Sequence, residues 1–439
     1  PTTNPERAAS TKMRTGPSAA TQINACAGCH SRRLQLSQHQ AGQPFTDNYL
    51  PMLIEQPLYH NDGQIKDEVF VWGSFTQSKM FQAGVVCSNC HDSHTLQLKI
   101  EGNGLCTQCH TPTEYDNQQH HQHLPASTGA QCVNCHMPDT TYMNVDKRRD
   151  HGFKIPRPAI SEQTSAPDAC TNCHNQKTQQ WAADNMAELF GHNLKPHPYA
   201  QAFAQSQTAS HKKTNQLLHI ANNTEIPNII RASALTHISA SHSNKSVLAL
   251  KEALNNTSAI IRLGAVRSLS TLPVPVRFDL LKENLNETSL SVRLEMARQL
   301  APLDLIQLKA QDIKYVKKLF SELISTIQYD ADTPENQVIL ANFYVARNQL
   351  EKAIKHFQVA LFLEPHFENA LLNLADLHRS LGDDLKALAL LKEVTQHHAR
   401  SPYGFYALGL LYVRQNSLLK AIDHFKKAIE LNKSNSHYV

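Results

Sequence analysis

Five short motifs between residues 26 and 174 combine the two residue types that bind metal-containing cofactors, cysteine and histidine. Each reads Cys-x-x-Cys-His, and together they use all ten cysteines of the chain. Two thiols at this spacing can add to the two vinyl groups of one porphyrin, while the adjacent histidine binds the iron. The motifs therefore predict five covalently bound haem c groups. The cysteines are Cys26, Cys29, Cys87, Cys90, Cys106, Cys109, Cys132, Cys135, Cys170 and Cys173, and the iron-binding histidines are His30, His91, His110, His136 and His174.

Zinc sites and redox dithiols also use Cys-x-x-Cys pairs, and one such pair alone would leave these alternatives open. Here the pair occurs five times and a histidine always follows directly. Zinc does not require a histidine at that position. Haem attachment is therefore the favoured interpretation over zinc or a disulfide framework.

Further histidines could supply the sixth ligand of each iron. The first 180 residues hold seven outside the motifs, which is enough for five irons and favours His/His ligation with low reduction potentials. We predict five of them as distal metal ligands. His121 is the substitute within its cluster, and His39, among Gln and Ser, is expected to be a solvated surface residue. The predicted distal ligands are His60, His94, His120, His123 and His151.

The residues around these motifs resemble known multihaem cytochromes. Gly129 to Pro138, followed by Asp150-His151 and a last motif, is similar to the second half of pentahaem cytochrome c nitrite reductases. Gly84 to His91 is similar to the hydroxylamine oxidoreductase group. Through Asp62-Gly63-Gln64-Ile65 and Arg148 to His151, the chain resembles tetratricopeptide-containing multihaem cytochromes still more closely. The nitrite reductases usually carry a Cys-x-x-Cys-Lys motif, which this chain lacks, so the resemblance does not extend to nitrite reduction.

The elements that position the motifs are expected to change along the chain. Five haems in about 150 residues leave little room for regular structure, so loops should wrap the cofactors. Ile230-Arg231, Ile261-Arg262 and Val292-Arg293 recur at intervals of 31 and predict HEAT-like helix pairs. Small residues 34 apart, such as Ala341, Ala375 and Gly409, are typical of tetratricopeptide repeats, in which paired helices approach closely.

The expected fold is therefore mainly α, with a loop-rich multihaem cytochrome c domain followed by an α-solenoid. No catalytic constellation is apparent from residue 181 onwards, and solenoid faces usually bind other proteins. The predicted domains are a polar N-terminal arm (1–20), a pentahaem domain (21–180), a helical junction (181–225), HEAT-like repeats (226–330) and tetratricopeptide repeats (331–439).

The composition and the absence of long apolar runs limit the expected cellular location and binding partners. The net charge of +4 and the lack of Lys/Arg-rich runs give no support for nucleic-acid binding. No apolar run reaches the roughly 18 residues needed to span a membrane. The chain begins at Pro1 without a leader, so we expect a processed form of an exported protein, in the periplasm or at the cell surface, because covalent haem attachment takes place outside the cytoplasm.

Three functions are compatible with these observations. The leading hypothesis is electron transfer along closely packed bis-histidine haems, with redox proteins or copies of the chain as partners and the repeats as a docking scaffold. The alternative is an oxidoreductase of the nitrite or hydroxylamine class with one open haem. A third hypothesis is assembly into a conductive filament. The surplus of histidines favours the first.

Overall fold

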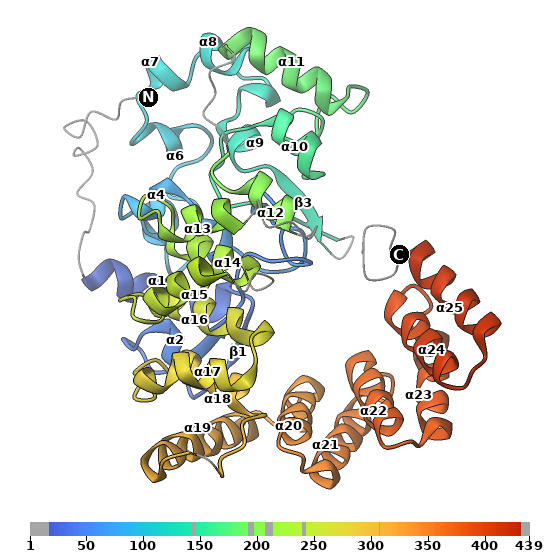
Figure 1. Ribbon diagram of the computed structural model, residues 1–439. Coiled ribbons are helices and arrows are strands. Elements are labelled where there is room, and N and C mark those ends of the chain that lie inside the picture. Colours follow the sequence, from blue (N-terminus) through green and yellow to red (C-terminus); the bar gives the residue numbers. More distant parts are fainter. Residues whose placement is uncertain are drawn as a thin grey trace. The chain divides into compact units, whose positions relative to one another are not determined.

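The computed structural model describes residues 17–142, 145–191, 197–206, 214–238, 243–306 and 308–431. The fold is mainly helical, as the sequence predicts (Figure 1). Most of the predicted N-terminal arm lies outside the described residues. The chain divides into two compact units, one of residues 1–273 and 287–292, the other of residues 274–286 and 293–439. The predicted limit at residue 180 lies inside the first unit, and the domain boundaries stay predictions.

The motif region of the first unit consists of short elements joined by loops. Apart from the first helix, no helix there exceeds seven residues among the residues described. Side chains three residues apart share one side of a helical turn. A helical turn that contains a Cys-x-x-Cys-His motif can therefore present both cysteines on the same side. The elements are α1 (Pro17–His30), β1 (Arg33–Gln35), α2 (Phe45–Asn48), β2 (Tyr49–Pro51), α3 (Trp72–Phe75), α4 (Lys79–Gln82), α5 (Cys87–Cys90), α6 (Gly104–Thr107), α7 (Pro112–Tyr115), α8 (Gln118–His121), η2 (Thr128–Ala130), α9 (Cys132–His136), β3 (Asp139–Tyr142), β4 (Asp146–Arg149) and α10 (Pro158–Thr164).

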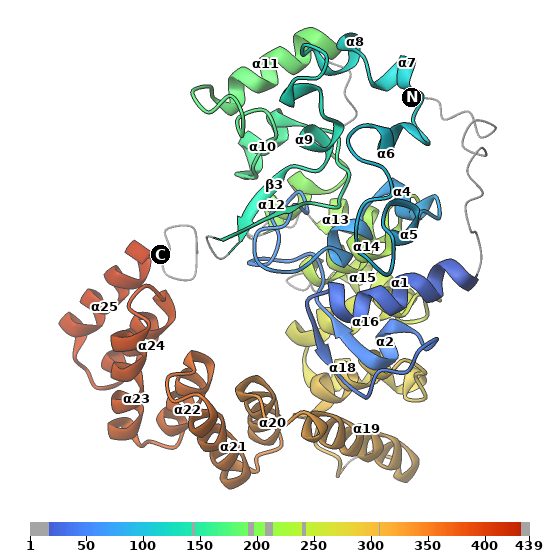
Figure 2. The same cartoon turned by 180° about the vertical axis from the view of Figure 1, so that it is seen from behind.

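Two antiparallel strand pairs occur in this region. Strand β1 pairs with β2, with Leu34 opposite Leu50, and β3 pairs with β4, with Asp139 opposite Arg149. The second pair begins three residues after His136 and ends two residues before His151. The strand pair therefore fixes how the chain segments that carry His136 and His151, two candidate iron ligands, lie relative to each other. In Figure 2, α1, α5 and α6 follow one another along one side of the unit.

Longer helices complete the first unit, and side chains on these helices and just before α12 (Ala200–Ser206) form hydrogen bonds with the motif loops. The Ser233 hydroxyl accepts a hydrogen bond from the buried main-chain N–H of Ile54 at 2.9 Å. The buried Tyr199 hydroxyl donates to the main-chain oxygen of Asp62 at 2.9 Å. The loops and these helices thus share one core. The helices are α11 (Gln179–Phe190), α12 (Ala200–Ser206), α13 (Thr214–Asn222), α14 (Asn228–Ile238), α15 (Asn244–Leu254) and α16 (Ala259–Ser268), followed by η4 (Leu269–Thr271).

The 31-residue period marks the start of three helices. Helices α14, α16 and α18 (Leu290–Leu300) each begin within three residues of the repeated apolar-Arg pair. Helices α14 and α16 pack so closely that a Cβ placed on Gly264 would lie 2.8 Å from the Cα of Ala232. The carbonyl carbon of Ala232 would lie 2.9 Å away. These are backbone atoms of a packed helix and cannot rotate away, so this approach requires glycine.

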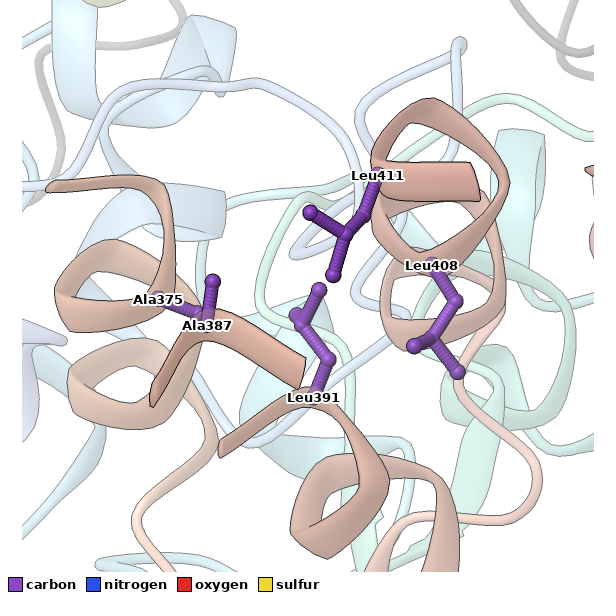
Figure 3. Packing of buried hydrophobic residues seen from close by; sticks show 5 residues of the cluster. All are labelled: Ala375, Ala387, Leu391, Leu408 and Leu411. Atoms are coloured by element: carbon purple, nitrogen blue, oxygen red, sulfur yellow. The ribbon is translucent and has the colours of Figure 1, made fainter. Parts of the chain in front are cut away.

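The second unit continues as antiparallel helix pairs. Ala375, which the 34-residue period singles out, packs with Ala387, Leu391, Leu408 and Leu411 in one buried cluster (Figure 3). The prediction of close helix approach at small residues is confirmed here. The elements are α17 (Val274–Leu281), η5 (Lys282–Asn284), α18, α19 (Ala310–Tyr329), α20 (Pro334–Ala346), α21 (Leu350–Leu363), α22 (Glu368–Ser380), α23 (Asp384–His397), α24 (Pro402–Arg414) and α25 (Leu418–Leu431).

Replacing Gly264 with alanine tests the close approach of α14 and α16. In an unhindered helix this change stabilises by about 1 kcal/mol, because glycine has more backbone freedom to lose. Here we expect the free energy of unfolding to fall by about 1 to 3 kcal/mol, the usual cost of overpacking. Denaturant titration followed by helical circular dichroism measures the change, and a stabilised protein would contradict the packing.

Two deletions test the unit boundary. Removing residues 334–436 leaves the first unit whole, so covalent haem content should be unchanged. Removing everything from residue 181 also removes Tyr199 and Ser233, which bond the loops at Asp62 and Ile54, so soluble haem-loaded protein should fall several-fold. Haem-stained gels and mass spectrometry provide the measurement. Equal haem content in the two proteins would show that the motif region folds without these helices.

Candidate haem sites

Three motif histidines each face a second histidine from another part of the chain. The ring centres of His91 and His151 lie 6.3 Å apart. Those of His136 and His120 lie 6.2 Å apart, and so do those of His174 and His123. The angles between the ring planes are small, at 25°, 17° and 32° respectively.

These separations can be compared with what one iron between two imidazoles requires. A metal–nitrogen bond of about 2.0 Å plus about 1.1 Å from nitrogen to ring centre, counted on both sides, gives about 6.2 Å between ring centres. All three observed distances agree with this value within 0.1 Å. The described residues therefore fit iron held between two histidines at three of the motifs.

Hydrogen bonds fix which ring nitrogen is available in each pair. The Nδ1 atoms of His91, His136 and His151 bond to the main-chain oxygens of Leu96, Lys154 and Arg149, at 3.3, 2.9 and 3.0 Å. His123 Nδ1 makes the same kind of bond to the His121 oxygen. A carbonyl only accepts, so these Nδ1 atoms carry the proton and Nε2 keeps its lone pair for a metal. Every pair contains at least one ring oriented in this way.

His121 has the opposite arrangement. Its Nδ1 accepts the main-chain N–H of His123 at 3.2 Å, so the neutral ring carries its proton on Nε2. Nε2 is the nitrogen that would have to bind an iron. Within the cluster predicted from the sequence, the geometry thus favours His120 and His123 as the ligands over His121.

The remaining predicted histidines lie elsewhere. His94 is exposed, in a turn where its main-chain N–H bonds to Asp92. His60 is half-buried in the loop before Asp62, and burial lowers its pKa. Within the described chain, neither ring forms a pair like the three above, nor do the motif histidines His30 and His110. His60 and His94 stay predictions. His39 is exposed and stacks loosely against Tyr49 at 6.0 Å.

Burial also favours neutral imidazoles at these positions. It is the main cause of the lowered pKa of His110, His120 and His151. A histidine must be neutral to donate a lone pair to a metal, so a lowered pKa extends metal binding to more acidic conditions.

Thiols of successive motifs lie next to each other. The Cys87 thiol forms a hydrogen bond with the Cys26 thiol, and burial together with that neighbour raises the pKa of Cys87 to about 12. The Cys106 thiol forms a hydrogen bond with the Cys132 thiol, and this hydrogen bond lowers the pKa of Cys132 to about 7. Burial, and to a lesser degree the nearby Cys109, raises the pKa of Cys90, and burial with the nearby Cys173 raises the pKa of Cys135. Each motif therefore has a cysteine within electrostatic range of one in the next motif along the chain.

Apolar side chains around the motifs suit a large apolar cofactor. Leu96 and Leu124 are 68% and 71% exposed, the first between the second and third motifs and the second directly after His123. Trp181 packs on the His174 ring at 5.0 Å. Gly129 lies against the His123 ring, where any Cβ would overlap ring atoms. A porphyrin face is the kind of surface that such side chains would cover.

Asp150 is a site residue whose role the sequence does not reveal. Its buried carboxylate accepts the main-chain N–H of Ile65 at 3.0 Å and that of Gly152 at 2.7 Å. It thereby anchors His151 between the Asp62 loop and the turn that follows β4. The resemblance includes Asp150-His151 as a pair, but a bond to residue 65 depends on tertiary contact.

Comparisons with known proteins match two parts of the chain. Residues 79–115 match a family described as the doubled CXXCH motif, and residues 334–436 match the TT21 fifth ARM repeats domain. The chain is 27% identical over 111 residues to anaphase-promoting complex subunit 3 of Schizosaccharomyces pombe, which is 25% of this chain and 17% of that protein. The chain therefore matches less than a fifth of the length of this relative.

Two solved structures of MamA also resemble the chain. They are 20% and 18% identical, cover 40% and 45% of this chain and 91% and 97% of theirs, and have TM-scores of 0.26 and 0.27. The doubled motif implies covalently bound haem c, and the match to the ARM repeats domain agrees with a helical repeat region. Within the described residues, no helix is long and apolar enough to cross a membrane.

Replacing Asp150 with alanine tests its anchoring role. Two buried N–H groups would lose their acceptor, so the free energy of unfolding should fall by about 2 to 4 kcal/mol. Asp146→Ala is the matched control, because that carboxylate is 51% exposed and pairs with Arg148 at the surface. Thermal or denaturant unfolding of both variants measures the difference. Equal stability would contradict the role of Asp150.

Proposed function

We propose that this chain is a five-haem c-type cytochrome that transfers electrons along haems arranged in chain order. The three histidine pairs at 6.2 to 6.3 Å are the observation that carries the proposal. An iron with an imidazole on both faces has no free position for a substrate, so such sites suit electron transfer. We assign His151, His120 and His123 as the second ligands at the second, fourth and fifth motifs.

The contacts between thiols support a continuous path. Haems attached to neighbouring cysteines have neighbouring porphyrin edges. The hydrogen-bonded pairs Cys26–Cys87 and Cys106–Cys132, with the nearby pairs Cys90–Cys109 and Cys135–Cys173, run through all five motifs. The first and fifth motifs are the ends of this series. The exposed cysteines among the described residues include Cys29 and Cys173 of these two motifs and also Cys109 of the third. Electrons would therefore have exposed sites at both ends and at the third motif.

The repeat region serves as a docking scaffold in this proposal. Repeat stacks generally bind other proteins, and other redox proteins or further copies of this chain are the proposed partners. A relation to the nitrite reductase and hydroxylamine oxidoreductase superfamily rests on the sequence resemblance alone, and filament assembly stays a prediction. We propose a periplasmic or cell-surface location because covalent haem attachment requires export.

Three substitutions and one matched control test the ligand assignment. In His151→Ala, His120→Ala and His123→Ala, one iron should lose its second imidazole and become high-spin, about one fifth of the total, while the thioether bonds keep all haems attached. His121→Ala should leave the spectrum unchanged, because the proton on its Nε2 excludes it as a ligand. Electron paramagnetic resonance of the oxidised proteins measures the spin states.

Haem number is measured on the same samples. Intact-mass spectrometry should show five haems in the unmodified protein and in all four variants. A smaller number would contradict the five-haem proposal. A high-spin signal in His121→Ala, or none in the other three, would contradict the pairing. A high-spin signal already present in the unmodified protein would favour the alternative of an oxidoreductase with an open haem.

A further inference from the structure

The third and fourth motifs are linked by a single side chain. The Asn103 amide nitrogen donates to the Asp116 carboxylate at 2.8 Å and to the Ala130 main-chain oxygen at 2.9 Å. Its amide oxygen accepts the main-chain N–H of Cys132 at 3.0 Å. Asn103 lies three residues before Cys106, whose thiol forms a hydrogen bond with that of Cys132. The two motifs are therefore fixed to each other at short range.

Tyr115 lies between histidines of these same two sites. Its ring centre is 5.6 Å from that of His110, with the rings at 84°, and 5.6 Å from that of His120, with the rings at 85°. Both contacts are edge-to-face, the arrangement that aromatic rings prefer. His110 belongs to the third motif, and His120 faces His136 of the fourth at 6.2 Å. One ring therefore contacts a histidine of each of two neighbouring sites.

The surrounding loop fixes the position of Tyr115. Tyr115 ends α7, and Asn117 joins α7 to α8 by donating to the Thr113 oxygen at 2.9 Å and accepting the His120 N–H at 3.1 Å. The Tyr115 hydroxyl forms a hydrogen bond with Glu114. The contacts with His110 and His120 are made by the Tyr115 ring.

We propose that Tyr115 is a positioning residue that sets the ring orientations of His110 and His120 and so couples the third and fourth haem sites. The inference rests on the proposed function, in which His110 and His120 are ligands of neighbouring irons. The orientation of an axial imidazole determines its overlap with the iron orbitals, and hence the paramagnetic signal and potential of that haem. A ring that touches both imidazoles lets a change at one site reach the other.

The test compares Tyr115→Leu with Tyr115→Phe in the full-length haem-loaded protein. Leucine removes both edge-to-face contacts, so two of the low-spin resonance signals should shift. Phenylalanine keeps the ring and removes only the bond to Glu114, so its spectrum should match the unmodified protein. Tyr115→Met, which fills the space without an aromatic ring, replaces leucine if that variant does not accumulate.

The outcomes separate this inference from the proposal on which it rests. A signal that disappears in His120→Ala identifies the fourth site, and that signal should be one of the two that shift in Tyr115→Leu. Unchanged signals in Tyr115→Leu, a shift of only one, or an equal shift in Tyr115→Phe would each overturn the role of Tyr115. Fewer than five haems, or no high-spin iron in His120→Ala, would instead overturn the proposed function. Equal unfolding temperatures of the leucine and phenylalanine variants would exclude a merely structural effect.

Discussion

The geometry of the haem region depends on hydrogen bonds from histidine Nδ1 atoms to main-chain carbonyls. A neutral imidazole offers only one nitrogen with a free lone pair, and the partner of the other nitrogen decides which one it is. In His91, His123, His136 and His151 that partner is a carbonyl of a nearby turn, so Nε2 is free in each case. The same principle separates His121 from its neighbours, because its Nδ1 accepts a hydrogen bond. Short turns of the backbone therefore determine which ring nitrogen is free to bind a metal.

Those turns need support, because loops with little regular structure cannot fix their own conformation. The support comes from polar side chains whose hydrogen bonds are satisfied, buried at Asp150 and Tyr199 and half-buried at Asn103. Asp150 accepts two main-chain N–H groups, Asn103 bonds three partners at once, and Tyr199 reaches the Asp62 loop from the segment just before α12. Leaving such groups unpaired costs more than the bond itself contributes, so these networks specify one arrangement. The motif loops and the helices up to α16 consequently share one compact unit.

The repeat region depends on a different constraint, the close approach of helices. Small residues at fixed intervals remove side-chain bulk where two helices meet, as at Gly264 in the first unit and Ala375 in the second. Each helix pair buries its apolar face only against its neighbours, so the pattern can repeat along the chain. This explains why two unlike kinds of packing occur in one polypeptide, one based on polar networks around the motifs and one on apolar stacking.

The sequence by itself determined the features that depend on spacing. Cys-x-x-Cys-His fixes the attachment chemistry locally, and the 31- and 34-residue periods predict the repeated helices, because both are short-range patterns. His120, His123 and His151 could be proposed as ligands from composition and context. Their partners could not, because residues 60 apart in sequence, such as His91 and His151, are brought together only by the tertiary fold. Only the tertiary structure shows which histidine rings lie near each other, that Nδ1 of His121 accepts a hydrogen bond, and where Tyr115 lies. Each depends on contacts and hydrogen-bond directions that no spacing encodes.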